Sequence, residues 1–274
     1  MPATTQWAKA NGVHLRYELT GSGAQTVVLL HEMSVSMESW DYVMPELARH
    51  YKVLRYDLRG FGLSERIRGT MSMDDEMNDL SGLLETLDIK DKVTLIGGAV
   101  GGAIALKYAA TYPEKVRAVV AISPAAYLKA RAAGGAGSPP AAQTAPPQSG
   151  PAQANDTSML DAVFPVKLQK AHPERFARFV AIQSAAAPAS SAATTPAAYS
   201  VSYSEVLPNI KCPTMIVATS LWMRPPESFK ELADATPGAR FEVLETGHFA
   251  SITSPELVLP LLKGFLQDTS GRRH

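Results

Sequence analysis

The chain has 274 residues, 46% of them hydrophobic, and its 26 basic and 26 acidic side chains leave no net charge. This balance lacks the electrostatic footprint of a nucleic-acid binder. No apolar run approaches the ~20 residues that a membrane span needs. The single cysteine, Cys212, excludes an internal disulfide, and the N-terminus lacks the basic and apolar segments of a signal peptide. We therefore expect a soluble, cytoplasmic protein that binds neither nucleic acid nor membrane.

Strands and helices are predicted to alternate along the chain. Residues 6–10 and 13–19 flank Asn11-Gly12, a dipeptide that favours a tight hairpin turn. Apolar runs typical of strands buried on both faces follow at 26–30, 53–56, 93–96, 116–122, 215–218 and 241–244. Helices are expected at 73–87, which starts with a Ser72–Asp75 capping box, at 101–112, and after Ser254. The alternation predicts an α/β fold with a mostly parallel, eight-stranded sheet and helices on both faces.

One long segment interrupts this pattern. Residues 132–158 and 185–198 consist largely of small residues, proline and glutamine, and we expect both to be mobile loops. Between them, 159–182 has apolar residues spaced as in a pair of short helices. We interpret 125–205 as a cap inserted into a core made of 1–124 and 206–274, because the later strands are needed to complete the sheet. A disordered linker between two domains is the alternative.

Four motifs occur in an order and spacing that resemble the α/β-hydrolase family, especially its small enol-lactonase and esterase-like members. They are LLHEM at 29–33, YDLRGFGLS at 56–64, LIGGAVGG at 95–102 and ETGHF at 245–249. The resemblance covers nearly the whole chain and implies the α/β-hydrolase fold. It places the nucleophile elbow at 97–101, where a sharp turn needs small neighbours. It also implies an oxyanion hole formed by the backbone N–H groups of Met33 and Val100, and a catalytic histidine at His248.

Three positions depart from the family's pattern. The nucleophile position holds Ala99, which has no oxygen to attack a carbonyl group; in other enzymes, losing the nucleophile costs about six orders of magnitude in turnover. Trp222 stands about where the family places its acid, and loss of that acid costs ~10⁴ in rate. Glu32 replaces the usual glycine of the oxyanion loop. Its carboxylate would repel a developing oxyanion if it points inward, but not if it faces solvent or pairs with a cation.

The remaining candidate residues are expected to have structural or substrate-binding roles. His31 is expected to shape the oxyanion turn, and it is also retained, with Trp222, as a candidate substrate-binding residue. Asp57 and Arg59 are expected to hold a turn, and Cys212 is interpreted as an inert buried thiol.

Three functions remain open, each with a small molecule as substrate or ligand and without a cofactor or metal. The first is an enzyme in which His248, with or without Glu32, moves a proton or activates water at a carbonyl, ester or lactone. The second is a ligand-binding pseudoenzyme with an apolar pocket. The third is a serine hydrolase inactivated by an engineered Ser-to-Ala change at position 99. Because three positions depart together, natural divergence is favoured over a single engineered change.

Overall fold

The computed structural model describes residues 5–130, 158–186 and 188–270. The predicted hairpin is confirmed: β1 (Gln6–Ala10) and β2 (Val13–Thr20) pair in antiparallel orientation. Asn11 and Gly12 connect them, with φ angles of 46° and 81°. These positive angles are those of the tight turn that the dipeptide favours.

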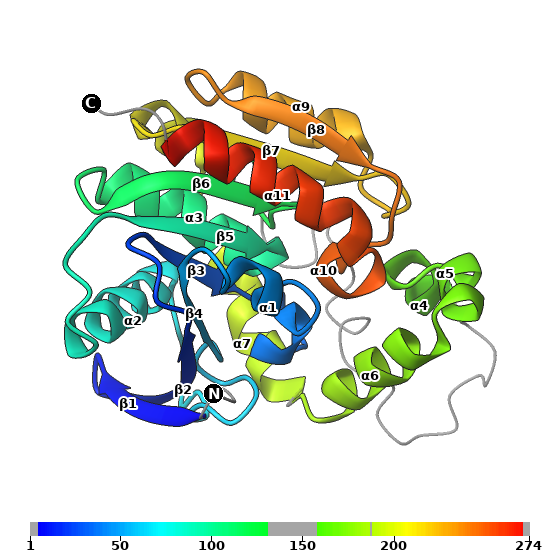
Figure 1. The fold of residues 1–274 in the computed structure, drawn as a ribbon, viewed down its shortest axis with the longest axis horizontal. Helices are drawn as coiled ribbons and strands as arrows, with labels where there is room; N and C mark the ends of the chain where they lie inside the picture. Colours follow the sequence, from blue (N-terminus) through cyan, green and yellow to red (C-terminus); the bar gives the residue numbers. More distant parts are fainter. Residues whose placement is uncertain (1–4, 131–157, 187, 271–274) are drawn as a thin grey trace.

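The eight strands form one sheet in the order β1-β2-β4-β3-β5-β6-β7-β8 (Figure 1). From β4 to β8 in this order every neighbouring pair is parallel, whereas β2 pairs with β4 in antiparallel orientation. The remaining strands are β3 (Thr26–Leu30), β4 (Lys52–Tyr56), β5 (Val93–Gly98), β6 (Val116–Ile122), β7 (Thr214–Thr219) and β8 (Arg240–Leu244). The predicted fold class is therefore confirmed.

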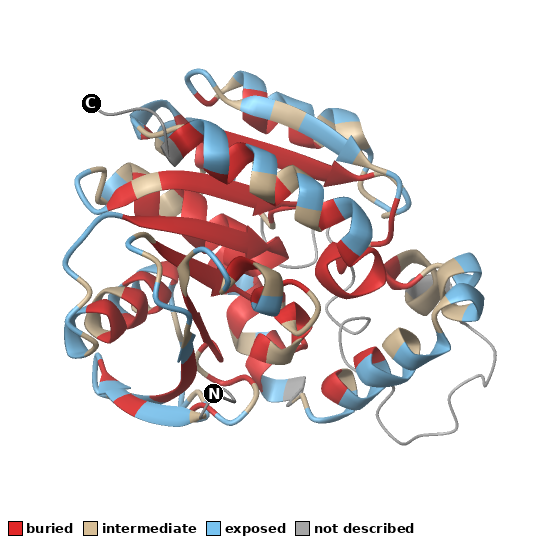
Figure 2. Ribbon diagram, in the orientation of Figure 1, coloured by how far each residue is buried: buried red, intermediate tan, exposed pale blue. Residues whose placement is uncertain are grey.

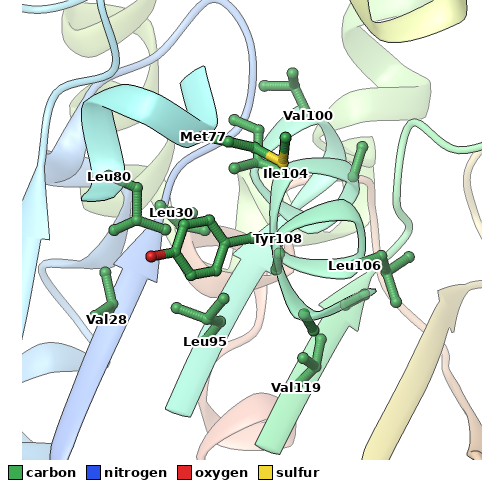
Figure 3. Close-up of a cluster of buried hydrophobic side chains, with 14 of the residues drawn as sticks. Val28, Leu30, Met77, Leu80, Leu95, Val100, Ile104, Leu106, Tyr108 and Val119 are labelled. Atoms are coloured by element: carbon green, nitrogen blue, oxygen red, sulfur yellow. The ribbon is translucent and has the colours of Figure 1, made fainter. Parts of the chain in front are cut away.

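Helices cover both faces of the sheet. One face packs against α2 (Met73–Thr86), α3 (Ala99–Thr111) and α9 (Pro226–Asp234), and the other against α1 (Met44–Leu47) and α11 (Pro255–Ser270). The predicted Ser72–Asp75 capping box starts α2. Figure 3 shows the ring of Tyr108 among side chains of β3, β5 and α2; its hydroxyl lies 3.0 Å from that of Ser81.

Four short helices complete this core. They are η1 (Met37–Trp40), α8 (Tyr203–Val206), η2 (Leu207–Asn209) and α10 (Ala250–Thr253). None of the helices in the described part of the chain is long and apolar enough to cross a membrane.

The last strand corrects one prediction. We expected 241–244 to be buried on both faces, but β8 is mostly exposed, and Val243 is 46% accessible (Figure 2). The reason is its position at the edge of the sheet, where only β7 pairs with it. A short apolar run does not show whether a strand is central or at an edge.

The segment between β6 and β7 corrects a second prediction. Residues 159–182 fall in three helices rather than two: α4 (Ser158–Val163), α5 (Val166–Ala171) and α6 (Pro173–Ser184). The loop expected at 185–198 is wrong, because α7 (Pro188–Tyr199) occupies most of it. Residues 132–157 of the other expected loop lie outside the described residues.

Burial explains why α7 is a helix despite its composition. Ala197, Ala198 and Tyr199 join the core on the α3 face of the sheet. The hydroxyls of Thr194 and Thr195 donate to the carbonyl groups four residues earlier, at 2.9 and 2.7 Å. Their polar atoms are thus satisfied inside the helix, and the small side chains allow close packing.

Glu76 of α2 is a buried acid without a partner. Its side chain is fully buried, and neither carboxyl oxygen has a hydrogen-bond partner among the described residues. The buried hydroxyl of Tyr56 is likewise unpartnered there. Burial, followed by the charge of Asp79, holds the pKa of Glu76 well above its usual value. An unsatisfied buried polar group costs free energy, so Glu76 destabilises the fold.

We predict that Glu76→Met raises the free energy of unfolding at pH 7 by about 1–3 kcal/mol. A raised folded-state pKa means that the wild type loses stability as pH rises above the unfolded-state pKa of Glu76, the ordinary glutamate value of about 4.5. The advantage of the variant should therefore grow from about pH 4.5 upward. Urea unfolding across this pH range measures the difference in the free energy of unfolding between the variant and the wild type.

Glu76→Gln is the matched control, which removes the titration but keeps a buried polar group. A Glu76→Met protein no more stable than wild type at pH 7 would contradict this account.

Candidate active site

The turn between β5 and α3 has the geometry of a nucleophile elbow. Ala99 begins α3 directly after the strand, is nearly buried, and has a φ of 43°. A side chain on Gly97 would place its Cβ 2.3 Å from the backbone of Gly101, so glycine is required there. The turn that the sequence motif predicts is present. Its apex carries a methyl group instead of a nucleophile.

His31, directly after β3, has both ring nitrogens bound to backbone. Its Nδ1 donates to the carbonyl of Glu32 at 2.6 Å, and its Nε2 accepts the N–H of Leu58 at 2.9 Å. Full burial lowers its pKa, so the ring is neutral. His31 therefore holds the oxyanion turn against the loop after β4. This geometry corrects its assignment as a substrate-binding residue, because neither nitrogen is left to meet a substrate.

The loop after β4 is held as expected. Asp57 accepts hydrogen bonds from the N–H groups of Met37 and Leu63, both at 2.8 Å, and pairs with Arg16. Arg59 pairs with Asp79 of α2. These contacts support the structural role assigned to Asp57 and Arg59. Burial also raises the pKa of the Cys212 thiol to about 11, consistent with an inert side chain.

The two candidate oxyanion donors come from different elements. Val100 lies in the first turn of α3, where backbone N–H groups have no intrahelical partner. Met33 follows Glu32 in the oxyanion loop, and its sulfur accepts the hydroxyl of Thr195 at 3.2 Å. Ser34 lies next, with a φ of 65°, and its hydroxyl is 2.9 Å from that of Ser191. Helix α7 therefore packs directly on the oxyanion loop.

His248 lies between β8 and α10 and is stacked on Trp222. The ring centroids are 4.0 Å apart and the planes differ by 15°. Its Nδ1 is buried without a hydrogen-bond partner among the described residues. Burial, and then the charge of Arg224, lower the pKa of His248 to about 3. The imidazole is therefore neutral at pH 7, and an aromatic ring stacks on it instead of a carboxylate pairing with it.

Arg224 fixes the loop that carries Trp222. Its guanidinium donates to the carbonyl groups of Pro124 and Ala126, at 3.1 and 2.8 Å, and lies over the rings of Tyr127 and Phe229. The loops after β6 and β7 are thereby joined by a cation. In the described part of the chain, no carboxylate is hydrogen-bonded to His248, and no three metal-ligating side chains cluster.

Glu32 lies behind the elbow. Only 2% of its surface is exposed, and its Oε1 accepts a long hydrogen bond of 3.4 Å from Ser251 of α10. A Cβ on Gly98 would lie 2.4 Å from that same oxygen, so Glu32 occupies the space that a side chain at position 98 would need. Oε2 has no partner among the described residues. Burial raises the pKa of Glu32 to about 7, against smaller opposite effects from its own backbone, Ser39 and Ser251.

Sequence reasoning missed the residues that surround these candidates. Ser251, Ser39 and Ser191 belong to no motif, and Gly98 has meaning only beside Glu32. A buried polar side chain on a short helix leaves no periodic signal. The one available hint was the joint departure of positions 32 and 99 from the family's pattern.

This combination of parallel sheet, elbow, oxyanion loop and histidine loop defines an α/β-hydrolase-type protein. The family model for the alpha/beta hydrolase fold matches residues 25–255, and the chain belongs to this family.

Individual proteins agree with this assignment. A stretch of 115 residues is 35% identical to 2-hydroxy-6-oxo-2,4-heptadienoate hydrolase of Pseudomonas putida, covering 40% of this chain and 41% of that one. The enol-lactonase of Burkholderia xenovorans LB400 has a TM-score of 0.84 at 23% identity, covering 96% of this chain and 100% of that one. A thermophilic esterase of Thermogutta terrifontis has a TM-score of 0.80 at 24% identity, covering 97% and 99%.

These two structures show a shared fold. The matched stretch spans only 35% to 41% of the first curated relatives it resembles. The similarity to hydrolases and esterases supports an enzyme.

We predict that Gly98→Ala destabilises the protein by about 1–3 kcal/mol, because the added methyl group overlaps the carboxyl group of Glu32. Urea unfolding of Gly98→Ala, Glu32→Ala and the double variant measures the coupling between the two sites. Gly264→Ala is the control, since a Cβ there meets nothing within 4 Å. If Gly98→Ala costs as much without Glu32 as with it, the two positions do not share this space.

Proposed function

We propose that the protein is a small-molecule enzyme that forms no covalent intermediate at position 99. The observation that carries the proposal is the shape of the elbow, with Ala99 at a φ of 43°. A residue with a side chain pays about 1–2 kcal/mol for a left-handed conformation. The turn is kept without the hydroxyl that it usually presents. In this proposal its remaining use is to position the N–H of Val100, with that of Met33, for an oxyanion.

His248 supplies the proton chemistry in this proposal. With its pKa lowered to about 3, the ring is in its basic form throughout the neutral range. It accepts a proton from a water molecule as that water attacks the carbonyl carbon of an ester or lactone, and the donors of the oxyanion hole stabilise the negative oxygen that develops. The intermediate then collapses, its C–O bond to the leaving group breaks, and protonated His248 returns the proton to the leaving oxygen. The names of the relatives, a hydrolase, an enol-lactonase and an esterase, support substrates with a carbonyl group. We take 125–205, which includes α4 to α7, as the cap that encloses the substrate.

A non-catalytic ligand-binding protein is the second candidate. Two observations favour it: Trp222 stacks on His248 where a triad carboxylate would pair with it, and an imidazole with a pKa of about 3 is a weak base. Ala99 and Trp222 also make their surroundings more apolar, as ligand sites tend to be.

We predict that the recombinant protein hydrolyses at least one member of a panel of enol-lactones, acyl homoserine lactones, methyl esters and 2-hydroxy-6-oxo-dienoates. His248→Ala should lower kcat/KM about 10²-fold, the lower end of general-base effects, because the base is weak. Because the base form persists down to about pH 3, ionisation of His248 should cause no loss of activity between pH 5 and 8.

The control is His14→Ala, which changes an exposed histidine of the hairpin that pairs with Glu65. Wild-type turnover that His248→Ala leaves unchanged would refute the role of His248. Tight binding by calorimetry, with the ligand recovered unmodified, would instead establish the binding protein.

We predict that Ala99→Ser alone reacts only slowly with a fluorophosphonate probe. The histidine that would serve such a serine in this proposal, His248, has no carboxylate at its Nδ1, and loss of the triad acid typically costs ~10⁴ in rate. Ala99→Ser combined with Trp222→Asp should react at least about 10²-fold faster, as measured by the rate of covalent labelling and intact mass.

Ala99→Ser with Trp222→Asn is the matched control, because asparagine has the shape of aspartate but no charge. Rapid labelling of Ala99→Ser alone would show that the chain is a serine hydrolase inactivated by a change at position 99.

A further inference from the structure

The carboxyl group of Glu32 points neither to solvent nor to a cation. It is buried between the oxyanion loop, Gly98 and α10, and no ion pair involving it is found in the described part of the chain. Exposure to solvent and pairing with a cation are the two arrangements that would keep the charge of Glu32 away from the oxyanion hole, and neither is found among the described residues. A carboxyl group held in this way must be neutral, or its charge acts on the surrounding backbone.

The groups that face Glu32 are few and mostly uncharged. Ser39 of η1 and Ser251 of α10 offer hydroxyls, and Gly98 offers only backbone. The nearest titratable groups along these elements are Glu38 of η1, which is next to Ser39 and pairs with Arg16, and two histidines. His31 is bound to backbone and His248 lies on the loop before α10; both are neutral, because burial lowers their pKa values. None of these groups supplies a net positive charge that would offset a negative charge on Glu32.

Glu32 is also close to both oxyanion donors. It directly precedes Met33 in the chain, and in space its carboxyl group lies against Gly98, two residues before Val100. An anion held by these N–H groups and an ionised Glu32 would be like charges in a poorly screened environment, and they repel each other.

We propose that Glu32 is a positioning residue, and that protonation of its carboxyl group sets the affinity of the oxyanion hole for an anionic oxygen. The inference rests on the proposed function, since it takes Met33 and Val100 as the donors. Protonated Glu32 leaves the hole free to stabilise an oxyanion, and ionised Glu32 opposes it. By linkage, an anion that binds in the hole favours uptake of a proton by Glu32. With a pKa of about 7, this exchange occurs in the neutral range.

Butyrate, a carboxylate ionised throughout pH 6–8, is the probe for this exchange. Calorimetry should give a dissociation constant for the wild type that weakens on the order of tenfold from pH 6 to pH 8. Titrations in two buffers of different ionisation enthalpy should reveal net proton uptake near pH 7. Glu32→Gln should bind butyrate with no such pH dependence and no proton uptake.

Glu76→Gln is the matched control, because it removes another buried acid of raised pKa that lies on α2, and it should keep the wild-type pH dependence. If Glu32→Gln retains the wild-type pH dependence, or if butyrate fails to bind the wild type at any pH, the inference is wrong. Absence of turnover, with pH-dependent butyrate binding intact, would refute the proposed function and leave the role of Glu32 standing.

A second measurement covers a Glu32→Gln variant that does not fold. In the wild type, the backbone amide resonances of Met33 and Val100 should titrate with a midpoint near pH 7, the value to which burial raises the pKa of Glu32. Amides that do not respond between pH 6 and 8 would overturn the proposal.

Discussion

The site depends on a contact between backbones that only glycine allows. A Cβ on Gly101 would lie 2.3 Å from the carbonyl oxygen of Leu30, at the end of β3. Without a Cβ at position 101, α3 can begin at the end of β5, against the strand that leads into the oxyanion loop. The positive φ of Ala99 and the position of Val100 in the first helical turn accompany this approach, and Gly98 beside them leaves the space that Glu32 fills. The framework is therefore independent of the nucleophile, and it persists without one.

Loss of the nucleophile is accompanied by a reversal of acid and base strengths. In the triad template a carboxylate orients and stabilises the histidine. Here His248 stacks on Trp222 and its pKa falls to about 3, whereas the buried carboxyl group of Glu32 has a pKa of about 7. The imidazole is thus a weaker base than the carboxylate. In the proposed function, this order leaves the imidazole as the unprotonated group of the site and the carboxyl group of Glu32 as the one that titrates near neutral pH.

The fold could be predicted from sequence because its signals are local and repeated. Apolar runs, a hairpin dipeptide and a capping box each reported one element, and their order gave the sheet. Helix α7 escaped prediction because its threonine hydroxyls are satisfied by its own carbonyl groups and its serine hydroxyls by distant loops, contacts that composition does not reveal. The exposure of β8 depends on its place in the sheet. The direction of Glu32 depends on the missing side chain of Gly98, which only three-dimensional contact makes visible.

Helix α7 has a consequence for how this protein can diversify. Its Ser191 and Thr195 contact Ser34 and Met33, so the helix shares side-chain contacts with the loop that carries a proposed oxyanion donor. In the proposed cap, a substitution on the inner side of α7 would change the space for the substrate and, through these contacts, the position of the neighbouring oxyanion loop. Substrate selectivity and reactivity would then change together, because both depend on this one helix.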